Sequence, residues 1–212
     1  MTTSRACDRI ASVIPVGTLA GAKTRLGETL DAEERQDLVV RLLTRTVAAA
    51  LAVEPLEDVL VVSPDREVLR CAAELGARTL RQRSRGLNAG LREARDDVVA
   101  GGATALLVLP IDLPFVSADA ISRVTDALGS LPHAAVVLVP DRHGIGTNAL
   151  ALRPPGVIDF VFGRASRAAH EAAAEAALAS FRELDGPLSF DLDTPDDYVA
   201  VETATHGGVH AR

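Results

Sequence analysis

Apolar residues in this chain come in short unbroken runs separated by mixed segments. Five runs are apolar at nearly every position: 11–16, 59–62, 105–109, 135–139 and 149–152. Continuous runs of this kind, rather than strict alternation, are typical of strands that are buried on both faces. They predict a mostly parallel sheet covered by helices on both sides.

Helical patterns separate these runs. Asp31 and Glu34 have the spacing of a capping box, and apolar residues follow them at helical intervals. Further helices are predicted at 67–75, 88–99, 118–128 and 165–179, and Thr194 with Pro195 opens a last short one. Strands that alternate with helices predict an α/β fold, in which ligands bind beyond the carboxyl ends of the strands.

The chain shows no internal repeat and no linker of low complexity. Its 212 residues are enough to bury a full core without disulfides or a structural metal. We therefore expect a single domain over residues 1–203, followed by a flexible C-terminal tail at 204–212.

Composition excludes several classes of protein. The 22 Lys and Arg against 29 Asp and Glu give a formal net charge of −7, which disfavours a nucleic-acid binder or a binder of anionic membranes. Two cysteines exclude a disulfide scaffold, and no apolar run approaches the roughly 20 residues of a membrane span. We expect a cytoplasmic protein with no membrane or nucleic-acid partner. A homodimer is compatible with the sequence, which does not fix the oligomeric state.

The first apolar run leads into a loop of small residues that carries Lys23 and Arg25. Small residues let backbone N–H groups approach an anion, and the two cations can reach phosphates; a solvated turn is the alternative. Gly17–Thr24 also matches the P-loop pattern GxxxxGK[ST], except that Ala22 replaces its second glycine. The P-loop interpretation is disfavoured, because the next capped helix starts only near Asp31.

Three aspartates follow predicted strands or precede a cap. Asp112 lies between two prolines after run 105–109, where it is suited to bind Mg²⁺, although a turn aspartate is also common there. Asp191 and Asp193 are two residues apart, so in an extended segment they project to one side. The three carboxylates are compatible with one metal site, and Asp193 ending a strand before the Thr194 cap is the alternative.

Two further loops have the composition of anion sites. Residues 141–148 combine two glycines with Thr147, and Gly163 precedes Ser166 at the start of an Ala-rich helix. Backbone nests and helix N-termini both bind anions. Ordinary loop chemistry explains either segment equally well on its own.

Six motifs in order resemble one known family, the guanylyltransferases of deazaflavin coenzyme F(420) biosynthesis. They are the loop that ends Ala22-Lys23-Thr24-Arg25-Leu26, then 86–89, 110–114, 141–148, Phe162-Gly163 with Ser166 and His170, and 191–195. The resemblance covers about residues 10–202. Members use phosphoenolpyruvate or 2-phospho-L-lactate as the acceptor.

The resemblance implies a Rossmann-like nucleotide-diphospho-sugar transferase (GT-A-like) fold and a guanylyltransferase that takes GMP from GTP and releases pyrophosphate. It also implies roles for residues, and every one of them is an expectation. Asp112, Asp191 and Asp193 hold Mg²⁺; Thr147, Gly163 and Ser166 surround the three-carbon phosphoacid; Lys23 and Arg25 face the triphosphate and act with Asp112 in catalysis; Gly86 and Asn88 line the nucleotide site.

One position departs from the family pattern, because Gly17 stands where a lysine is usual. The loss of that cation weakens triphosphate binding unless Lys23 and Arg25 suffice. Two alternatives therefore stay open: a Mg-dependent nucleotidyltransferase that acts on a sugar phosphate or cofactor precursor, and a catalytically inactive nucleotide-binding homologue. The sequence does not choose between phosphoenolpyruvate and 2-phospho-L-lactate, or fix the number of metal ions.

Overall fold

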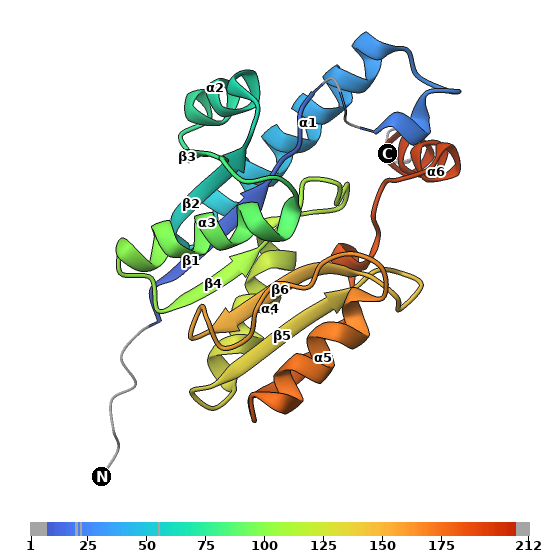
Figure 1. The fold of residues 1–212 in the computed structure, drawn as a ribbon. Coiled ribbons are helices and arrows are strands. Elements are labelled where there is room, and N and C mark those ends of the chain that lie inside the picture. The colour runs from blue at the N-terminus through green and yellow to red at the C-terminus, as the bar shows by residue number, and fades with distance from the viewer. Residues whose placement is uncertain (1–7, 20, 22, 55, 207–212) are drawn as a thin grey trace.

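The computed structural model describes residues 8–206 except 20, 22 and 55 (Figure 1). Its core is a seven-stranded sheet in which β6 runs antiparallel to both of its neighbours, β4 and β5, and the other pairs are parallel. The spatial order is β3 (Arg78–Arg81), β2 (Leu56–Ser63), β1 (Ile10–Pro15), β4 (Ala105–Val108), β6 (Thr147–Arg153), β5 (Ala135–Pro140) and β7 (Ser180–Glu183).

Helices cover both faces of this sheet, and each face has its own hydrophobic cluster. On one side lie α1 (Ala32–Leu51), α2 (Arg66–Glu74) and α4 (Ala118–Ser130); on the other lie α3 (Leu87–Ala100) and α5 (Ser166–Ala176). Two 3-10 turns, η1 (Thr24–Leu26) and η2 (Pro187–Ser189), and a last helix, α6 (Pro195–His206), complete the described elements.

Neighbouring residues of a central strand face opposite layers. In β1, Ile14 packs into the cluster that holds α1 and α4, whereas Val13 packs into the cluster that holds α3, and neither is exposed. This burial on both faces explains why the central strands are continuous apolar runs in the sequence. It confirms the predicted mostly parallel sheet between two layers of helices.

Each of the five predicted runs coincides with a strand, with Val16 and Leu109 one residue beyond β1 and β4, but β3 and β7 have no apolar run and were not predicted. Both are edge strands of four residues with charged side chains, and a strand with one partner needs less apolar surface. The antiparallel direction of β6 could not be predicted from the sequence either, because this strand is buried on both faces, as the parallel central strands are.

Helix boundaries shift by a few residues from the predicted ones. α4 continues through Gly129 to Ser130, and α5 ends at Ala176 rather than Ala179, because the chain turns at Leu178 (φ 52°) into β7. α6 extends to His206, so residues 204–206 are helical rather than part of the predicted tail; residues 207–212 lie outside the described part of the chain. In the part that is described, no helix is long and apolar enough to cross a membrane.

The carboxyl ends of the parallel strands meet at one edge of the sheet. The chain runs from β1 outward through β2 to β3, and then returns to place β4 on the other side of β1. This reversal between β1 and β4 is the topological switch point, at which open α/β sheets bind ligands.

Candidate active site

Lys23 joins three segments at the switch point. It caps η1 with left-handed backbone (φ 50°, ψ 37°), and its Nζ lies 3.0 Å from Asp193 Oδ1 and 3.5 Å from Asp112 Oδ2. Nζ also donates to the carbonyl of Leu192, whose own N–H donates to the carbonyl of Asp112 at 2.9 Å. The side chain is 10% exposed, so this cation is largely removed from water. The structure thus brings together Lys23, Asp112 and Asp193, which are far apart in the sequence.

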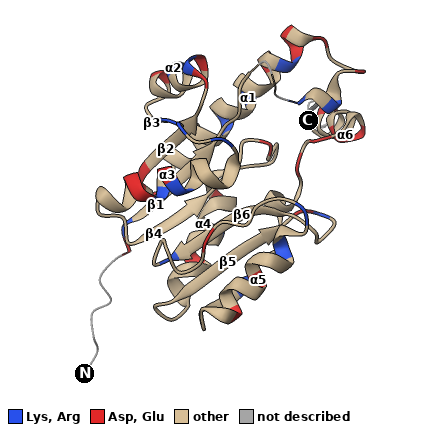
Figure 2. Ribbon diagram, viewed as in Figure 1, with Lys and Arg blue, Asp and Glu red and all other residues tan. Residues whose placement is uncertain are grey.

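Arg25 lies beside the same acids but faces solvent. Its Nη1 is 3.7 Å from Asp193 Oδ2, and its side chain is 76% exposed. Figure 2 shows basic and acidic segments near each other at the end of the molecule where η1 and the start of α6 lie. Arg25 is therefore free to turn toward a bound anion, whereas Lys23 is held in place.

The P-loop interpretation is wrong for this loop. A P-loop lysine opens a long helix at the phosphate site, but here Lys23 precedes a three-residue 3-10 turn and α1 starts only at Ala32. Asp31 caps that helix, and its carboxylate and that of Glu34 form the predicted capping box.

A cavity of about 580 Å³ opens beside the Lys23 cluster. Residues that follow β1 and β4 form its walls, among them Gly17, Thr18, Lys23, Arg25 and Asp112, together with Asp193. Leu87, at the start of α3, adds an apolar surface to the same cavity and is 45% exposed. The combination of apolar wall, cations and carboxylates suits a ligand with a flat apolar part and a charged part.

Asp191 completes the group of acids. Burial raises the pKa of its carboxyl, and the negative charges of Asp193, Asp112 and Asp141 raise it further. Its Oδ1 is buried and has no hydrogen-bond partner among the described residues. Within the same part of the chain, no three His, Cys, Asp or Glu side chains form a ready metal-binding group. Nevertheless, an unpaired buried carboxylate oxygen beside two further carboxylates is the donor chemistry that Mg²⁺ prefers, so these residues fit that ion.

The acidic segment 191–193 is fixed by the start of α6. Thr194 Oγ1 accepts from Asp197 N at 3.3 Å, and the Asp197 carboxylate accepts from the N–H groups of Asp193 and Thr194 at 3.0 and 2.8 Å. Arg142 forms an ion pair with Asp197 and lies over the ring of Phe190. Burial would raise the pKa of Asp197, but these hydrogen bonds outweigh burial and lower it to about 2. The predicted Thr194 cap is confirmed.

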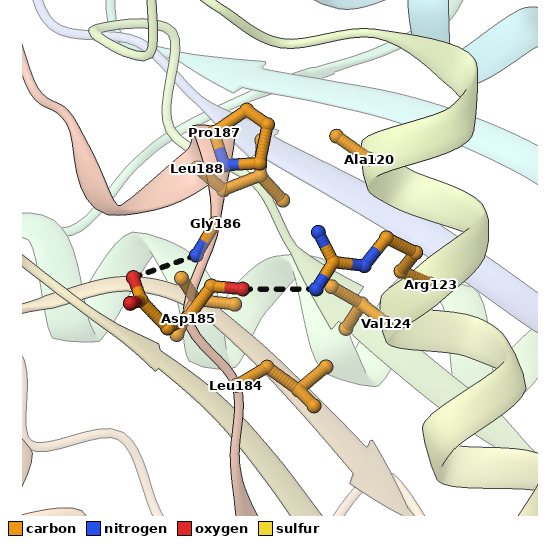
Figure 3. Close-up of a pocket in the computed structure, with 9 residues that line it drawn as sticks. Ala120, Arg123, Val124, Leu184, Asp185, Gly186, Pro187 and Leu188 are labelled. Carbon is orange, nitrogen blue, oxygen red and sulfur yellow. Dashed lines mark hydrogen bonds between the residues drawn. The ribbon is translucent and has the colours of Figure 1, made fainter.

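The segment that leads to these acids is tied to α4 (Figure 3). Arg123 donates to the carbonyl of Asp185 at 3.1 Å, and the Asp185 carboxylate accepts from Gly186 N at 2.7 Å. Gly186 has φ 149°, a backbone conformation that favours glycine, whereas the 2.8 Å between an added Cβ and Arg123 Nη1 would require only a shift of that flexible side chain. α4 itself is capped by Ser117, as predicted, which leaves Asp112 free for the site.

A second cluster gathers around the start of β6 and the start of α5. Thr147 Oγ1 lies 3.0 Å from Nδ1 of His170, which is one turn along α5 from Ser166. Ser166 N donates to the carbonyl of Gly163 at 3.2 Å, and Gly163 has φ 136° with open space where a Cβ would be. The structure therefore brings Thr147, Gly163 and Ser166 to one place, and Asp141, six residues before Thr147, is near enough to Asp191 for its negative charge to raise the pKa of that carboxyl.

Asn88 holds the loop of this second cluster. Its side-chain amide donates to the carbonyl of Phe162 and accepts from Phe162 N, both at 2.9 Å. Gly86 is the N-cap of α3 with φ 91°. Leu87, which lies between Gly86 and Asn88, is the residue of this segment that lines the cavity beside Lys23. A direct role of Gly86 and Asn88 in nucleotide binding stays a prediction.

Sequence reasoning did not predict the contacts of three residues that organise the site, although His170 is part of the fifth motif and Arg142 lies in the loop 141–148. His170, Asp197 and Arg142 act through tertiary contacts with segments 20 or more residues away. The one local signal was at Asp197, which lies three residues after the Thr194 cap, at the position where a capping box carries an acid.

The fold of this protein is similar to that of nucleotide-diphospho-sugar transferases and cytidylyltransferases. The chain superposes on a proposed nucleotide-diphospho-sugar transferase from Desulfovibrio desulfuricans G20 with a TM-score of 0.75, at 16% identity, over 95% of this chain and 89% of that one. It superposes on a cytidylyltransferase from Leptospira borgpetersenii with a TM-score of 0.65, at 12% identity, over 94% and 87%. At these identities the likeness shows the fold alone.

Sequence comparison identifies the family. Residues 10–211 match the model of the family described as guanylyl transferase CofC-like, and the chain belongs to that family. It is 44% identical to a phosphoenolpyruvate guanylyltransferase of Sphaerobacter thermophilus over 94% of this chain and 95% of the relative. It is also 44% identical to that of Rubrobacter xylanophilus (96% and 97% covered) and 32% identical to a 2-phospho-L-lactate guanylyltransferase of Methanocaldococcus vulcanius (87% and 80%). The family resemblance of the six motifs is confirmed.

The buried ring of His170 predicts a loss of stability in acid. Burial lowers the pKa of His170 to about 4 from its ordinary 6.5, and a hydrogen bond with the Ser166 backbone acts in the opposite direction. Between these two pH values the unfolded chain binds a proton at His170 and the folded chain does not. The contribution of His170 to the free energy of unfolding is therefore complete above pH 6.5 and is lost as the pH falls toward 4.

We expect the free energy of unfolding of His170→Asn to fall less between pH 7 and pH 5 than that of the parent, by about 2 kcal/mol. Urea unfolding at the two pH values measures it. His133→Asn, at an exposed position, is the control and should follow the parent. An equal loss in His170→Asn and the parent would contradict the prediction.

Proposed function

We propose that this protein transfers GMP from GTP to phosphoenolpyruvate and releases pyrophosphate, with 2-phospho-L-lactate as the alternative acceptor. Membership of the guanylyl transferase CofC-like family supports the guanylyl donor. Phosphoenolpyruvate is preferred because the two relatives at 44% identity carry that name, whereas the 2-phospho-L-lactate relative is 32% identical. A place in coenzyme F(420) biosynthesis is part of the same proposal.

One observation carries the proposal: Lys23, Asp112 and Asp193 meet on the wall of the cavity at the switch point. A nucleoside triphosphate carries several negative charges beside a flat base. In the proposed complex, Leu87 faces the apolar part of the nucleotide, while Lys23 and Arg25 face the phosphates. Gly17 and Thr18 let the chain approach closely at the same wall.

The proposed reaction needs alignment and neutralisation of charge rather than a protein base. The acceptor is a phosphate monoester with a second pKa near 6, so it is largely dianionic at neutral pH. One of its oxygens forms the new bond to the α-phosphorus of GTP, and the bond from that phosphorus to the oxygen shared with the β-phosphorus breaks. The electron pair leaves with pyrophosphate, whose growing negative charge Lys23 and Arg25 offset.

Mg²⁺ is part of this proposal. Asp112, Asp191 and Asp193 are the residues that would hold it, and the unpaired Oδ1 of buried Asp191 supports the assignment. When bound, the ion would neutralise phosphate charge and help to orient the two substrates.

The second cluster is the proposed acceptor site. Thr147, Gly163 and Ser166 offer a hydroxyl, an open backbone and the N-terminus of α5, all of which can donate to a phosphate or carboxylate. The negative charge of Asp141, in the loop that leads to Thr147, is near enough to Asp191 to raise the pKa of that carboxyl, which supports an acceptor next to the proposed metal site.

The first prediction from the proposed function tests the reaction itself. The purified protein with GTP, Mg²⁺ and phosphoenolpyruvate should release pyrophosphate, and Asp112→Asn should lower kcat by at least about 100-fold, because it removes a carboxylate from the proposed ion. Asp126→Asn, exposed on α4, is the matched control and should keep full activity.

The acceptor screen separates the alternatives. Release with 2-phospho-L-lactate but not with phosphoenolpyruvate would reassign the acceptor. Release only with a sugar phosphate would reject the proposed acceptor class. Tight GTP binding with no release for any acceptor would identify an inactive homologue.

The second prediction separates Lys23 from Arg25. Lys23→Met removes a held cation next to two carboxylates and should lower kcat by about 100-fold or more, whereas Arg25→Met should cost less than about tenfold because Arg25 is exposed to water. Steady-state kinetics measures both, with thermal unfolding as the check on folding. Equal losses would contradict the distinct roles.

The third prediction concerns Gly17. A Cβ at this position would meet nothing within 4 Å, so a longer side chain fits beside the cavity that Gly17 lines. We expect Gly17→Lys to lower KM for GTP by about three- to tenfold through the added cation. Gly17→Met, which adds length without charge, is the control. An unchanged KM in Gly17→Lys would show that Lys23 and Arg25 already suffice.

A further inference from the structure

His170 is a fully buried histidine that the proposed reaction does not use. It lies on the inner side of α5, with 0% of its surface exposed, and contacts two other segments of the second cluster, the proposed acceptor site. One is Thr147 at the start of β6, and the other is the stretch Val161–Phe162 just before Gly163. A histidine placed between the residues of a binding site can control how they are oriented.

The backbone assigns the tautomer of this ring. Val161 N is a backbone N–H, which can only donate, and it lies 3.2 Å from His170 Nε2. Nε2 must therefore be the bare, accepting nitrogen. Because burial lowers the pKa of His170 to about 4, the ring is neutral at pH 7 and carries one N-bound hydrogen, which must be on Nδ1.

This tautomer dictates the role of the Thr147 hydroxyl. Nδ1–H of His170 points at Thr147 Oγ1, 3.0 Å away, with the Ser166 backbone as a second acceptor beside the ring, and a protonated Nδ1 cannot accept a hydrogen from the Thr147 hydroxyl. The hydrogen of the hydroxyl is then directed away from His170. In the described part of the chain, no other hydrogen-bond partner of Thr147 Oγ1 is seen, although the residue is 8% exposed. A nearly buried hydroxyl whose hydrogen is unpaired is a donor that a ligand oxygen can satisfy.

The ring cannot easily turn over to reverse these roles. Phe162 packs edge-on against the imidazole, with 4.9 Å between the ring centroids. The backbone of Phe162 is in turn held by both side-chain atoms of Asn88 at 2.9 Å. A flip would also leave the N–H of Val161 without its acceptor. The direction of the hydrogen bonds, from Val161 to His170 and from His170 to Thr147, is thus fixed by the fold.

We propose that His170 is a positioning residue that holds the Thr147 hydroxyl as a hydrogen-bond donor toward an anionic oxygen of the acceptor. The inference rests on the proposed function for the identity of the acceptor. It adds a requirement on specificity: the acceptor must present an oxygen with a free lone pair, from a phosphate or a carboxylate, at Thr147. An acceptor that presents a hydroxyl hydrogen there would be disfavoured.

Two substitutions of His170 separate its two hydrogen bonds. The amide nitrogen of Asn reproduces the position of Nδ1, so His170→Asn keeps a donor to Thr147, whereas Gln reaches the position of Nε2 and keeps only the acceptor for Val161 N. We expect His170→Gln to raise KM for phosphoenolpyruvate by about tenfold and to leave KM for GTP within about twofold. His170→Asn should keep KM for phosphoenolpyruvate within about threefold of the parent.

A purely structural role would give a different result. It would change both substrates alike, or would make Asn and Gln equally harmful, and either result would overturn the proposal. Should both variants fail to fold in thermal unfolding, Thr147→Val and Thr147→Ser decide it. Ser keeps the hydroxyl and should keep KM for the acceptor low, whereas Val should raise that KM by about tenfold and leave KM for GTP unchanged.

A measurement without turnover tests the tautomer directly. In ¹⁵N-histidine-labelled parent protein at pH 7, the long-range ¹⁵N–¹H spectrum should show His170 with a protonated Nδ1 and a bare Nε2. A protonated Nε2 would overturn the proposal even if pyrophosphate is released. Conversely, absence of pyrophosphate release would reject the proposed function while leaving the spectrum unchanged, so the two failures are distinguishable.

Discussion

The ion pairs of Lys23 are the contacts on which the geometry of the site depends. Asp112 and Asp193 come from segments about eighty residues apart, and two carboxylates at close range repel each other. The Lys23 ammonium lies within 3.5 Å of both, and it also binds the Leu192 carbonyl, so the repulsion is offset at the point where the loops meet. Because the lysine is 10% exposed, this attraction is screened by water much less than a surface ion pair would be.

The sheet supplies the rigid frame for this arrangement. β1 and β4 are buried on both faces, so their ends cannot move far, and the loops that follow them carry Lys23 and Asp112. The sequence therefore predicts these positions well. An unbroken apolar run indicates a buried strand, and because parallel strands end at one edge of the sheet, the Pro-flanked aspartate that follows the run is expected at that edge. Edge strands β3 and β7 escaped prediction because their single-partner position leaves charged residues free to face solvent.

The partners of the site residues were harder to predict than their positions. That Lys23 faces phosphate stays a proposal, but its contacts with Asp112 and Asp193 were not predicted, because this pairing depends on the left-handed turn at Lys23 itself. His170 lies in an Ala-rich helical pattern, where nothing local distinguishes a ring that bridges two other segments from one packed in the core. The bridging role of His170 depends on tertiary contacts between β6, the loop at 161–163 and α5, so the local sequence does not predict it.

The two clusters differ in a way that suits the proposed transfer. Around the large cavity the donors include the cations Lys23 and Arg25, whereas the second cluster combines a buried hydroxyl and the start of a helix with the exposed Arg164 between Gly163 and Ser166. Full cations lower the nucleophilicity of a phosphate that they bind, but neutral donors orient it and leave most of its charge on oxygen. Cations where charge must accumulate on pyrophosphate, and a buried hydroxyl donor that orients the acceptor, favour transfer from GTP to the acceptor. A neutral His170 is consistent with this arrangement, because a protonated ring would add a positive charge beside the nucleophile.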